Sequence, residues 1–381
     1  MDHHPRPRDV REGATMQCGS RLDDTSSKVY DLDVFSGEKR MPPAYPRISV
    51  LTRRAIACAV LATAFTSYGS VASPVQEEPA ASPWQDRLET LRYWTPKRMR
   101  EAAVLSSSST GKPVEPPVTP GGDEIGYAPV PLPYARSMPT RVTGQLFFHD
   151  PLRKEDGHCS ASVVQSASRR LILTAAHCVV SATIEPPITW NEHLMFVPAY
   201  DGTRPPSDSA YAPYGLWPIT RVYVSAVGKQ NPITLFRTDY DVAVAGVFDD
   251  AGPIEDVVCG GLMPRLSNPD DPITFPKVRV VGYPSAAAYS GAEQFHCESS
   301  TMLSLTPSGI RLLQCGLASG NSGGPVMVVD DNDDNFVQVA AVVHNPFEQS
   351  RLLPYVYPAL EAMANSEHRR GLSAAPTSPC P

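Results

Sequence analysis

The feature that most constrains the fold is a series of short apolar runs that begins after residue 142. Turn-forming residues separate the runs, and no helical periodicity lies between them. This spacing is typical of antiparallel β-sandwiches and barrels, whereas a parallel α/β sheet would need helices between its strands. We therefore predict an all-β domain over residues 141–365. The runs are GQLFF (144–148), SASVV (160–164), RLILTAA (170–176), LMFVPAY (194–200), ITRVYV (219–224), DVAVAGV (241–247), VRVVGYP (278–284), PVMVV (325–329) and VQVAAVV (337–343).

The stretch before this domain, residues 73–140, has a different composition. Of the 40 prolines in the chain, a dense set lies between Pro74 and Pro139. Apolar periodicity is weak there except over Trp84–Leu105, a potential helix that Pro96 is expected to interrupt. Proline-dense stretches are more typical of linkers and pro-segments than of a core. We predict a removable pro-segment here, with an ordinary disordered linker as the alternative.

An apolar stretch, Ala55–Phe65, lies in the N-terminal part of the chain. It is shorter than the roughly 20 apolar residues that cross a bilayer as a helix. Two arginines precede it and small residues ending at Ala72 follow it, which is the pattern of a secretory signal peptide cleaved after that alanine. The alternative is an internal apolar segment of a cytosolic protein. We expect residues 41–72 to be the signal peptide and residues 1–40 to be an extension in front of the true start.

The formal net charge of -7 and the lack of a lysine or arginine run argue against a surface for phosphate groups or nucleic acid. Six of the cysteines follow the predicted cleavage site. An even number in a secreted protein predicts disulfides but leaves their pairing open. No pair has the CxxC spacing of a zinc ribbon, so we expect no metal site. The six are Cys159, Cys178, Cys259, Cys297, Cys315 and Cys380.

The stretch CGLASGNSGGP (315–325) surrounds Ser322 with glycines. Serine is a poor nucleophile until a base removes its proton, and the base needs an acid that holds its tautomer. His177 ends the run RLILTAAHC, and Asp241 opens the run DVAVAGV. Taken singly, a histidine beside a cysteine is ordinarily a packed core residue, and an aspartate before a strand is ordinarily a turn residue.

Taken together, the motifs TAAHC, DVAV and GNSGGP, in that order, resemble the chymotrypsin-like (trypsin-like) serine peptidases over residues 142–360, and the asparagine form of the serine motif is similar to secreted bacterial members. The resemblance implies two antiparallel six-stranded β-barrels with the active site between them. It implies His177 as general base and acid, Asp241 as its orienter and Ser322 as nucleophile. The N–H groups of Gly320 and Ser322 would form the oxyanion hole.

The resemblance also implies a disulfide between Cys159 and Cys178. Cys297 and Cys315 bracket STMLSLTPSGIRLL, which has the pattern of a hairpin, and a bridge between them would brace the chain before Ser322. Cys259 and Cys380 then remain as a pair by elimination.

Several residues depart from the digestive members of this family. Asn321 stands where those enzymes have an aspartate that pairs with a freed N-terminal amine, so the site-like Arg141–Val142 is not expected to act as an activation site. Gly316 stands where trypsin-like enzymes carry a substrate-binding aspartate, which disfavours cleavage after basic residues. His344 is a candidate for the substrate pocket, because glutamate-specific relatives use a histidine in this region. The alternative for His344 is a surface histidine at a strand end.

Two other functions remain as alternatives. GNSGG also fits the GxSxG motif of α/β-hydrolase esterases, although that fold needs a helix after the serine and the histidine after the acid. A peptidase-like binding protein without catalysis is the other alternative. Residues 330–335 (DDNDDN) have the composition of a calcium site, but a solvated hairpin loop explains them more simply.

The sequence thus predicts a secreted, extracellular, cofactor-free serine endopeptidase that acts on polypeptide substrates as a monomer. It predicts no nucleic-acid partner, and no membrane association once the signal peptide is removed. Residues 366–381 are expected to form a flexible tail.

Overall fold

The computed structural model describes residues 79–102, 111–181, 189–227, 237–248, 252–268, 274–286, 288–303, 308–329, 337–345 and 348–368. The predicted extension, the signal peptide, the acidic loop 330–335 and Cys380 lie outside these residues. Within the described part, no helix combines the length and apolar character of a membrane span.

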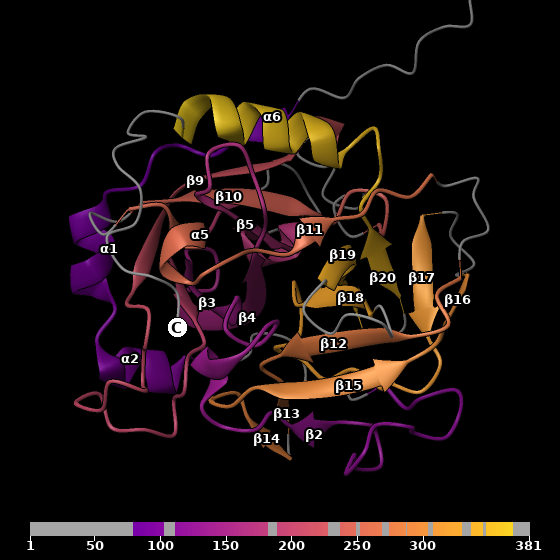
Figure 1. Cartoon of the computed structure of the whole chain (residues 1–381). Helices are drawn as coiled ribbons and strands as arrows, with labels where there is room; N and C mark the ends of the chain where they lie inside the picture. The colour runs from indigo at the N-terminus through magenta and orange to yellow at the C-terminus, as the bar shows by residue number, and fades with distance from the viewer. Residues whose placement is uncertain are drawn as a thin grey trace, which may run out of the picture. The chain divides into compact units, whose positions relative to one another are not determined.

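A closed barrel of six antiparallel strands forms the first half of the fold (Figure 1). The strand order is β9-β10-β5-β4-β3-β8, and β8 pairs again with β9, where Met195 lies opposite Pro218. Its inward side chains, such as Leu146 and Val222, are fully buried. The strands are β3 (Thr143–Asp150), β4 (Glu155–Val163), β5 (Leu171–Thr174), β8 (Glu192–Pro198), β9 (Trp217–Ser225) and β10 (Ala243–Val247).

A second, half-barrel sheet forms the other half, in the order β16-β17-β20-β19-β18-β12-β15-β2. Only Ser300 separates β15 from β16, so strands near the two ends of this path are consecutive in the chain. One short strand, β11 (Met263–Pro264), pairs with β19 in parallel. The other strands are β2 (Ala128–Pro129), β12 (Val278–Gly282), β15 (Phe295–Ser299), β16 (Thr301–Leu303), β17 (Gly309–Leu312), β18 (Pro325–Val329), β19 (Val337–Val343) and β20 (Gln349–Arg351).

The all-β, double-barrel prediction is therefore confirmed. Each predicted apolar run contains a strand, and β16 and β17 form the hairpin expected between Cys297 and Cys315. Two small sheets were not predicted. They pair β13 (Ser285–Ala286) with β14 (Tyr289–Ser290), and β6 (Val180–Ser181) with β7 (Thr189–Trp190).

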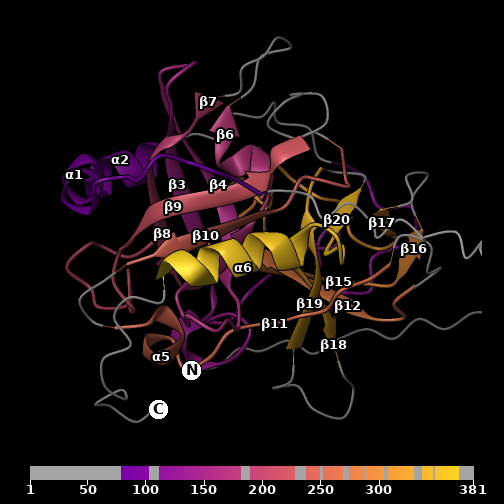
Figure 2. The same cartoon turned by 90° about the horizontal axis from the view of Figure 1, so that it is seen from above.

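The predicted flexible tail is wrong at its beginning, because Ser366 belongs to helix α6 (Tyr357–His368). Figures 1 and 2 show α6 along β9 and β10. Glu367 near its end accepts hydrogen bonds from Arg221 at 2.8 Å and from the Tyr223 hydroxyl at 2.6 Å. The helix is thus fixed to the first barrel by buried and charged contacts.

The stretch before the barrels is folded where the structure describes it, so a disordered linker does not fit these residues. Strand β1 (Pro79–Ala81) pairs with β9, and β2 pairs with β15. The predicted helix is split as expected: α1 (Arg87–Tyr93) ends before Thr95, and α2 (Pro96–Glu101) starts with Pro96 in its first turn. Thr95 caps α2 by accepting from Arg98 N–H at 3.2 Å. The remaining short helices are η1 (Tyr134–Arg136), η2 (Ala176–Cys178) and α5 (Ile254–Val257).

Trp94, between α1 and α2, anchors this stretch on the barrel. Its side chain is 3% exposed and packs on Phe147 of β3, with ring centroids 5.4 Å apart. Its indole N–H donates to the carbonyl of His193. Burial of this aromatic ring makes the stretch part of the same folding unit as the barrel.

We therefore expect Trp94→Ala to lower the free energy of unfolding by about 3–5 kcal/mol, because it removes a buried aromatic ring and leaves a cavity. Trp84→Ala is the matched control, since Trp84 lies in the same stretch with 55% exposure. Urea denaturation of both variants measures the difference. Equal stability of the two would contradict the proposed anchoring.

His158 of β4 forms a second contact between this stretch and the barrel. Its Nδ1 hydrogen-bonds with the carbonyl of Ala102 at 3.0 Å, and its Nε2 is buried without a partner in the described part of the chain. Burial lowers the pKa of His158 from 6.5 to about 4, although the bond to Ala102 opposes the shift. The folded state therefore holds His158 neutral.

A histidine with a lowered pKa contributes stability above its unfolded pKa, and this contribution is lost as pH falls from about 6.5 through about 4. We expect the wild type to lose roughly 3 kcal/mol over this window from His158 alone. His158→Gln cannot titrate, so the difference in unfolding free energy between the two proteins should change with pH in this window. A difference that is constant from pH 7 to pH 4 would refute this assignment.

Candidate active site

His177 lies in η2, directly after β5. Its neighbour Cys178 is bonded to Cys159 of β4, as the family resemblance implied. The short helix and the disulfide together fix the turn that carries the imidazole. The side chain is 18% exposed, so one edge of the ring reaches solvent.

Asp241 is brought to His177 by strand register. It lies two residues before β10, and β10 pairs with β5 so that Ala243 faces Thr174. The Asp241 carboxylate is fully buried. Its Oδ1 accepts from the main-chain N–H of His177 at 2.8 Å, and its Oδ2 from His177 Nδ1 at 2.8 Å. Two of the three predicted triad residues are therefore hydrogen-bonded to each other.

His344 also contacts this carboxylate, because its Nδ1 hydrogen-bonds with Asp241 Oδ2. Burial would raise the pKa of Asp241, but the charges and hydrogen bonds of His177 and His344 outweigh it and hold that pKa below its usual range. The two imidazole rings meet edge to face, with centroids 6.1 Å apart. His344 is 8% exposed, so its prediction as a surface histidine is wrong. Its role in a substrate pocket stays a prediction, and its Nδ1 contacts the aspartate.

Ser322 lies in a tight turn between the two barrels. Gly320 has a φ of +87°, and a Cβ there would lie 2.3 Å from the carbonyl oxygen of Tyr283. Gly323 has a φ of +76°, and its Cβ would lie 2.1 Å from Thr174 Oγ1, three residues before His177. Only glycine fits both positions. These contacts bring the turn against the strand end that carries His177.

Ser160 of β4 holds this turn, a role that sequence reasoning did not identify. Its N–H donates to the carbonyl of Ser322 at 2.8 Å, and its hydroxyl donates to the carbonyl of Gly320 at 2.8 Å. The same hydroxyl accepts from Tyr283 N–H at 2.9 Å. In the sequence this serine is one small residue of the run SASVV, so no local signal marks it.

The turn leaves two donors available. Among the described residues, neither the N–H of Gly320 nor that of Ser322 donates to another group of the protein. Ser322 Oγ and His177 Nε2 are not hydrogen-bonded in this part of the structure. The described geometry thus provides a paired histidine and aspartate, together with a serine turn that has two unused N–H groups.

Two further predicted positions lie in packed surroundings. Gly316 donates its N–H to the carbonyl of Ile125 at 2.8 Å, and a Cβ there would lie 2.0 Å from the carbonyl oxygen of Gly111. The N-terminal stretch therefore lies against Gly316, and the role of Gly316 in a substrate pocket stays a prediction. Val142 is fully buried, and the expectation that Arg141–Val142 is not an activation site stays a prediction.

The expected bridge between Cys297 and Cys315 is also present. Cys259 is disulfide-bonded as well, and its predicted partner Cys380 lies outside the described residues. The strand β18 follows Ser322 directly where an α/β-hydrolase would have a helix, which argues against the esterase alternative.

Two described groups of side chains have donor atoms within 4.8 Å of one another, the spacing needed to hold a metal ion. In one, the cysteines Cys159 and Cys178 are consumed by their disulfide. In the other, His177 and His344 direct Nδ1 to Asp241. We therefore assign the second group to hydrogen bonding.

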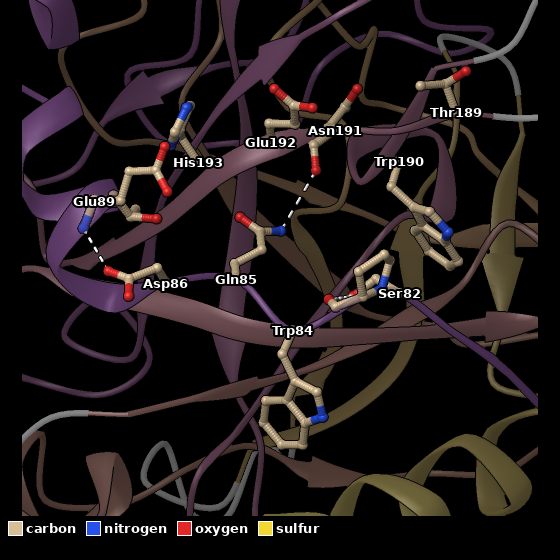
Figure 3. A pocket seen from close by; sticks show the side chains of 12 residues that line it. Ser82, Trp84, Gln85, Asp86, Glu89, Thr189, Trp190, Asn191, Glu192 and His193 are labelled. Carbon is tan, nitrogen blue, oxygen red and sulfur yellow. Dashed lines mark hydrogen bonds between the residues drawn. The ribbon is translucent and has the colours of Figure 1, made fainter.

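A hollow of about 440 Å³ lies elsewhere, between Ser82–Thr90 and Thr189–His193 (Figure 3). Gln85 Nε2 donates to the carbonyl of Asn191 across it at 3.5 Å. None of the predicted catalytic residues lines this hollow.

Part of the chain matches a known family. Residues 159–337 match the family described as "Trypsin-like peptidase domain". No match was found among curated proteins.

Among solved structures, the chain is similar to a thermostable serine protease, AL20, from an extremophilic microorganism, with 19% identity, a TM-score of 0.48, and coverage of 59% of this chain and 98% of that one. It is similar to the protease Anisep from Arthrobacter nicotinovorans, with 21% identity, a TM-score of 0.45, and coverage of 59% and 95%. It is also similar to a Glu endopeptidase, with 18% identity, a TM-score of 0.46, and coverage of 65% and 100%.

The matched region contains His177, Asp241 and Ser322, and extends from the first barrel into the second. Within this region, the chain is therefore similar to the trypsin-like peptidase domain.

Proposed function

We propose that this chain is a secreted serine endopeptidase in which Ser322 is the nucleophile, His177 the general base and acid, and Asp241 the residue that orients His177. The observation that carries the proposal is the buried Asp241 carboxylate, which accepts from both the main-chain N–H and the Nδ1 of His177. An ionised carboxylate at this position fixes the proton on Nδ1, so Nε2 is the nitrogen that serves as base.

In the proposed reaction, Ser322 Oγ attacks the carbonyl carbon of the scissile peptide while its proton passes to His177 Nε2. The imidazolium then protonates the leaving amine as the carbon–nitrogen bond breaks, which leaves an acyl ester on Ser322. A water molecule gives its proton to Nε2 and attacks the ester carbonyl. The imidazolium then returns a proton to Ser322 Oγ as the bond to the acyl group breaks and the acid product leaves. Asp241 stays ionised throughout and stabilises the imidazolium that forms twice in the cycle.

The N–H groups of Gly320 and Ser322 would bind the oxyanion of each tetrahedral intermediate. Two observations support this role: both donors are unused among the described residues, and the glycine at 320 adopts a φ of +87°. Donors fixed in advance cost little reorganisation when the charge develops, and each contributes about 3 kcal/mol to lowering the barrier.

The proposal also covers where the protein acts and what it cleaves. The disulfides Cys159–Cys178 and Cys297–Cys315 support folding in an oxidising compartment, which fits secretion. Polypeptides are the proposed substrates, and the monomer is the proposed form. We propose no preference for basic side chains, since Gly316 supplies no carboxylate to bind them.

The central test is Ser322→Ala, which should lower kcat on a casein substrate by about 10⁶-fold, since no other hydroxyl replaces the nucleophile. Asp241→Asn should lower it by about 10⁴-fold, because the amide no longer fixes the tautomer of His177. Ser366→Ala, on the exposed side of α6, is the matched control and should retain full activity.

Equal turnover by Ser322→Ala and wild type would remove the catalytic proposal. If the wild type neither cleaves casein nor reacts with a fluorophosphonate probe, the peptidase-like binding protein becomes the better assignment.

His344 gives a second prediction, because it shares Asp241 Oδ2 with His177. His344→Ala removes one hydrogen bond to the carboxylate but leaves the proposed triad intact, so kcat should fall by only about tenfold. His344→Asn keeps an N–H donor at this position and should recover part of the loss. The kcat values of the two variants on casein test this, and an alanine variant as active as wild type would show that the shared bond has no role in catalysis.

A further inference from the structure

We propose that Tyr127 is a positioning residue for the oxyanion hole, acting through Asn321, and that the segment that carries it is a permanent part of the active protein. We call residues 111–130 the Tyr127 segment. The inference rests on the proposed function of Ser322. The inference differs from the prediction of a removable pro-segment, because it requires residues 111–130 to be retained after maturation.

Asn321 is the residue between the two proposed oxyanion donors, Gly320 and Ser322. Its side chain is fully buried, and its Nδ2 donates to the Tyr127 hydroxyl at 3.0 Å. Its Oδ1 is buried without a partner in the described part of the chain. The bond to Tyr127 therefore fixes the side chain of the turn's central residue, and with it the orientation of the peptide groups on either side.

The bond joins two neutral groups. Burial raises the pKa of Tyr127 well above its usual value, and the neighbouring Tyr289 and Asp123 shift it in the same direction, so the hydroxyl stays protonated. A charged amine from a cleaved N-terminus would find no carboxylate at Asn321. A tyrosine hydroxyl supplied by an uncleaved chain suits the buried amide instead.

The main chain that carries Tyr127 is held by hydrogen bonds. Asp123 Oδ1 accepts from Tyr127 N–H and from Ile125 N–H, each at 3.0 Å, which closes the turn before the tyrosine. The carbonyl of Ile125 accepts from Gly316 N–H at 2.8 Å. The turn is thus attached to the stretch of chain that leads to Ser322.

The beginning of the Tyr127 segment also lies along that stretch. Gly111 N–H donates to the carbonyl of Leu317 at 3.1 Å, and the N–H groups of Val114 and Glu115 donate to the carbonyl of Leu313 at 2.9 and 2.8 Å. Further along, β2 pairs with β15 (Figure 1). Loss of the segment would leave these main-chain groups and the Asn321 amide without partners, which is costly for buried groups.

The test compares Tyr127→Phe with Tyr214→Phe in the full chain as secreted. Tyr214 donates its hydroxyl to the carbonyl of Ala135 at 3.1 Å, so the control removes the same chemical group elsewhere. An alkyl fluorophosphonate probe reports the reactivity of Ser322 without knowledge of the preferred substrate. We expect Tyr127→Phe to react about five- to tenfold more slowly, with full final stoichiometry, and to cleave casein with lower kcat and unchanged KM. Tyr214→Phe should match the wild type.

Several results would overturn the inference. One is a Tyr127→Phe variant that reacts with the probe as fast as the wild type. Another is a Tyr214→Phe variant that is slowed as much as Tyr127→Phe. A lower stoichiometry with an unchanged rate per labelled site would indicate a purely structural role and would also overturn it. A mass spectrum of the labelled, active protein must contain residues 111–130, and their absence would refute retention.

The pair is tested further by combining Tyr127→Phe with Asn321→Ala. If the two side chains act through one bond, the double variant reacts as slowly as Asn321→Ala alone, whereas additive losses would show that they act separately. A wild type that never reacts with the probe overturns the proposed function and this inference together. A reactive wild type with an unaffected Tyr127→Phe overturns the inference alone.

Discussion

The site depends on a charge buried from water. A carboxylate with no exposure is costly unless hydrogen bonds replace its hydration, and Asp241 receives them from His177 and His344. The barrel register that pairs β10 with β5 brings the first of these partners, and the strand β19 ends beside the second. The interaction thus joins the first barrel to the second at the point where the proposed chemistry occurs.

The Ser322 turn is held from two other directions. Ser160 of β4 binds the carbonyls of Gly320 and Ser322, whereas Asn321 between them is bound by Tyr127. The carbonyls are thereby turned toward the first barrel, and the N–H groups of Gly320 and Ser322 remain unused. A turn with its oxygen atoms engaged and its N–H groups available is suited to a developing negative charge.

Much of this architecture could be predicted from the sequence, because the first barrel and the core strands of the second are apolar runs. The motifs around His177 and Asp241 likewise predicted two residues that are hydrogen-bonded to each other. The sequence of strand β15 is FHCES. It contains no apolar run, because half-buried polar side chains lie beside buried ones. Helix α6 was missed for a related reason: its sequence, YPALEAMANSEH, is weakly amphipathic, and its position depends on contacts with Arg221 and Tyr223 that no local pattern reveals.

The least predictable part was the stretch before the barrels, whose proline content resembles that of a linker. The family match begins at Cys159, yet the first barrel is incomplete without β3, which precedes that residue and pairs with both β4 and β8. Further upstream, Trp94 is buried against the first barrel and Tyr127 against the second. Pro96 lies in the first turn of α2 within this packed layer, so the proline density here does not by itself indicate disorder. The folding unit is therefore larger than the family domain, and the added layer reaches Asn321, the residue next to Ser322.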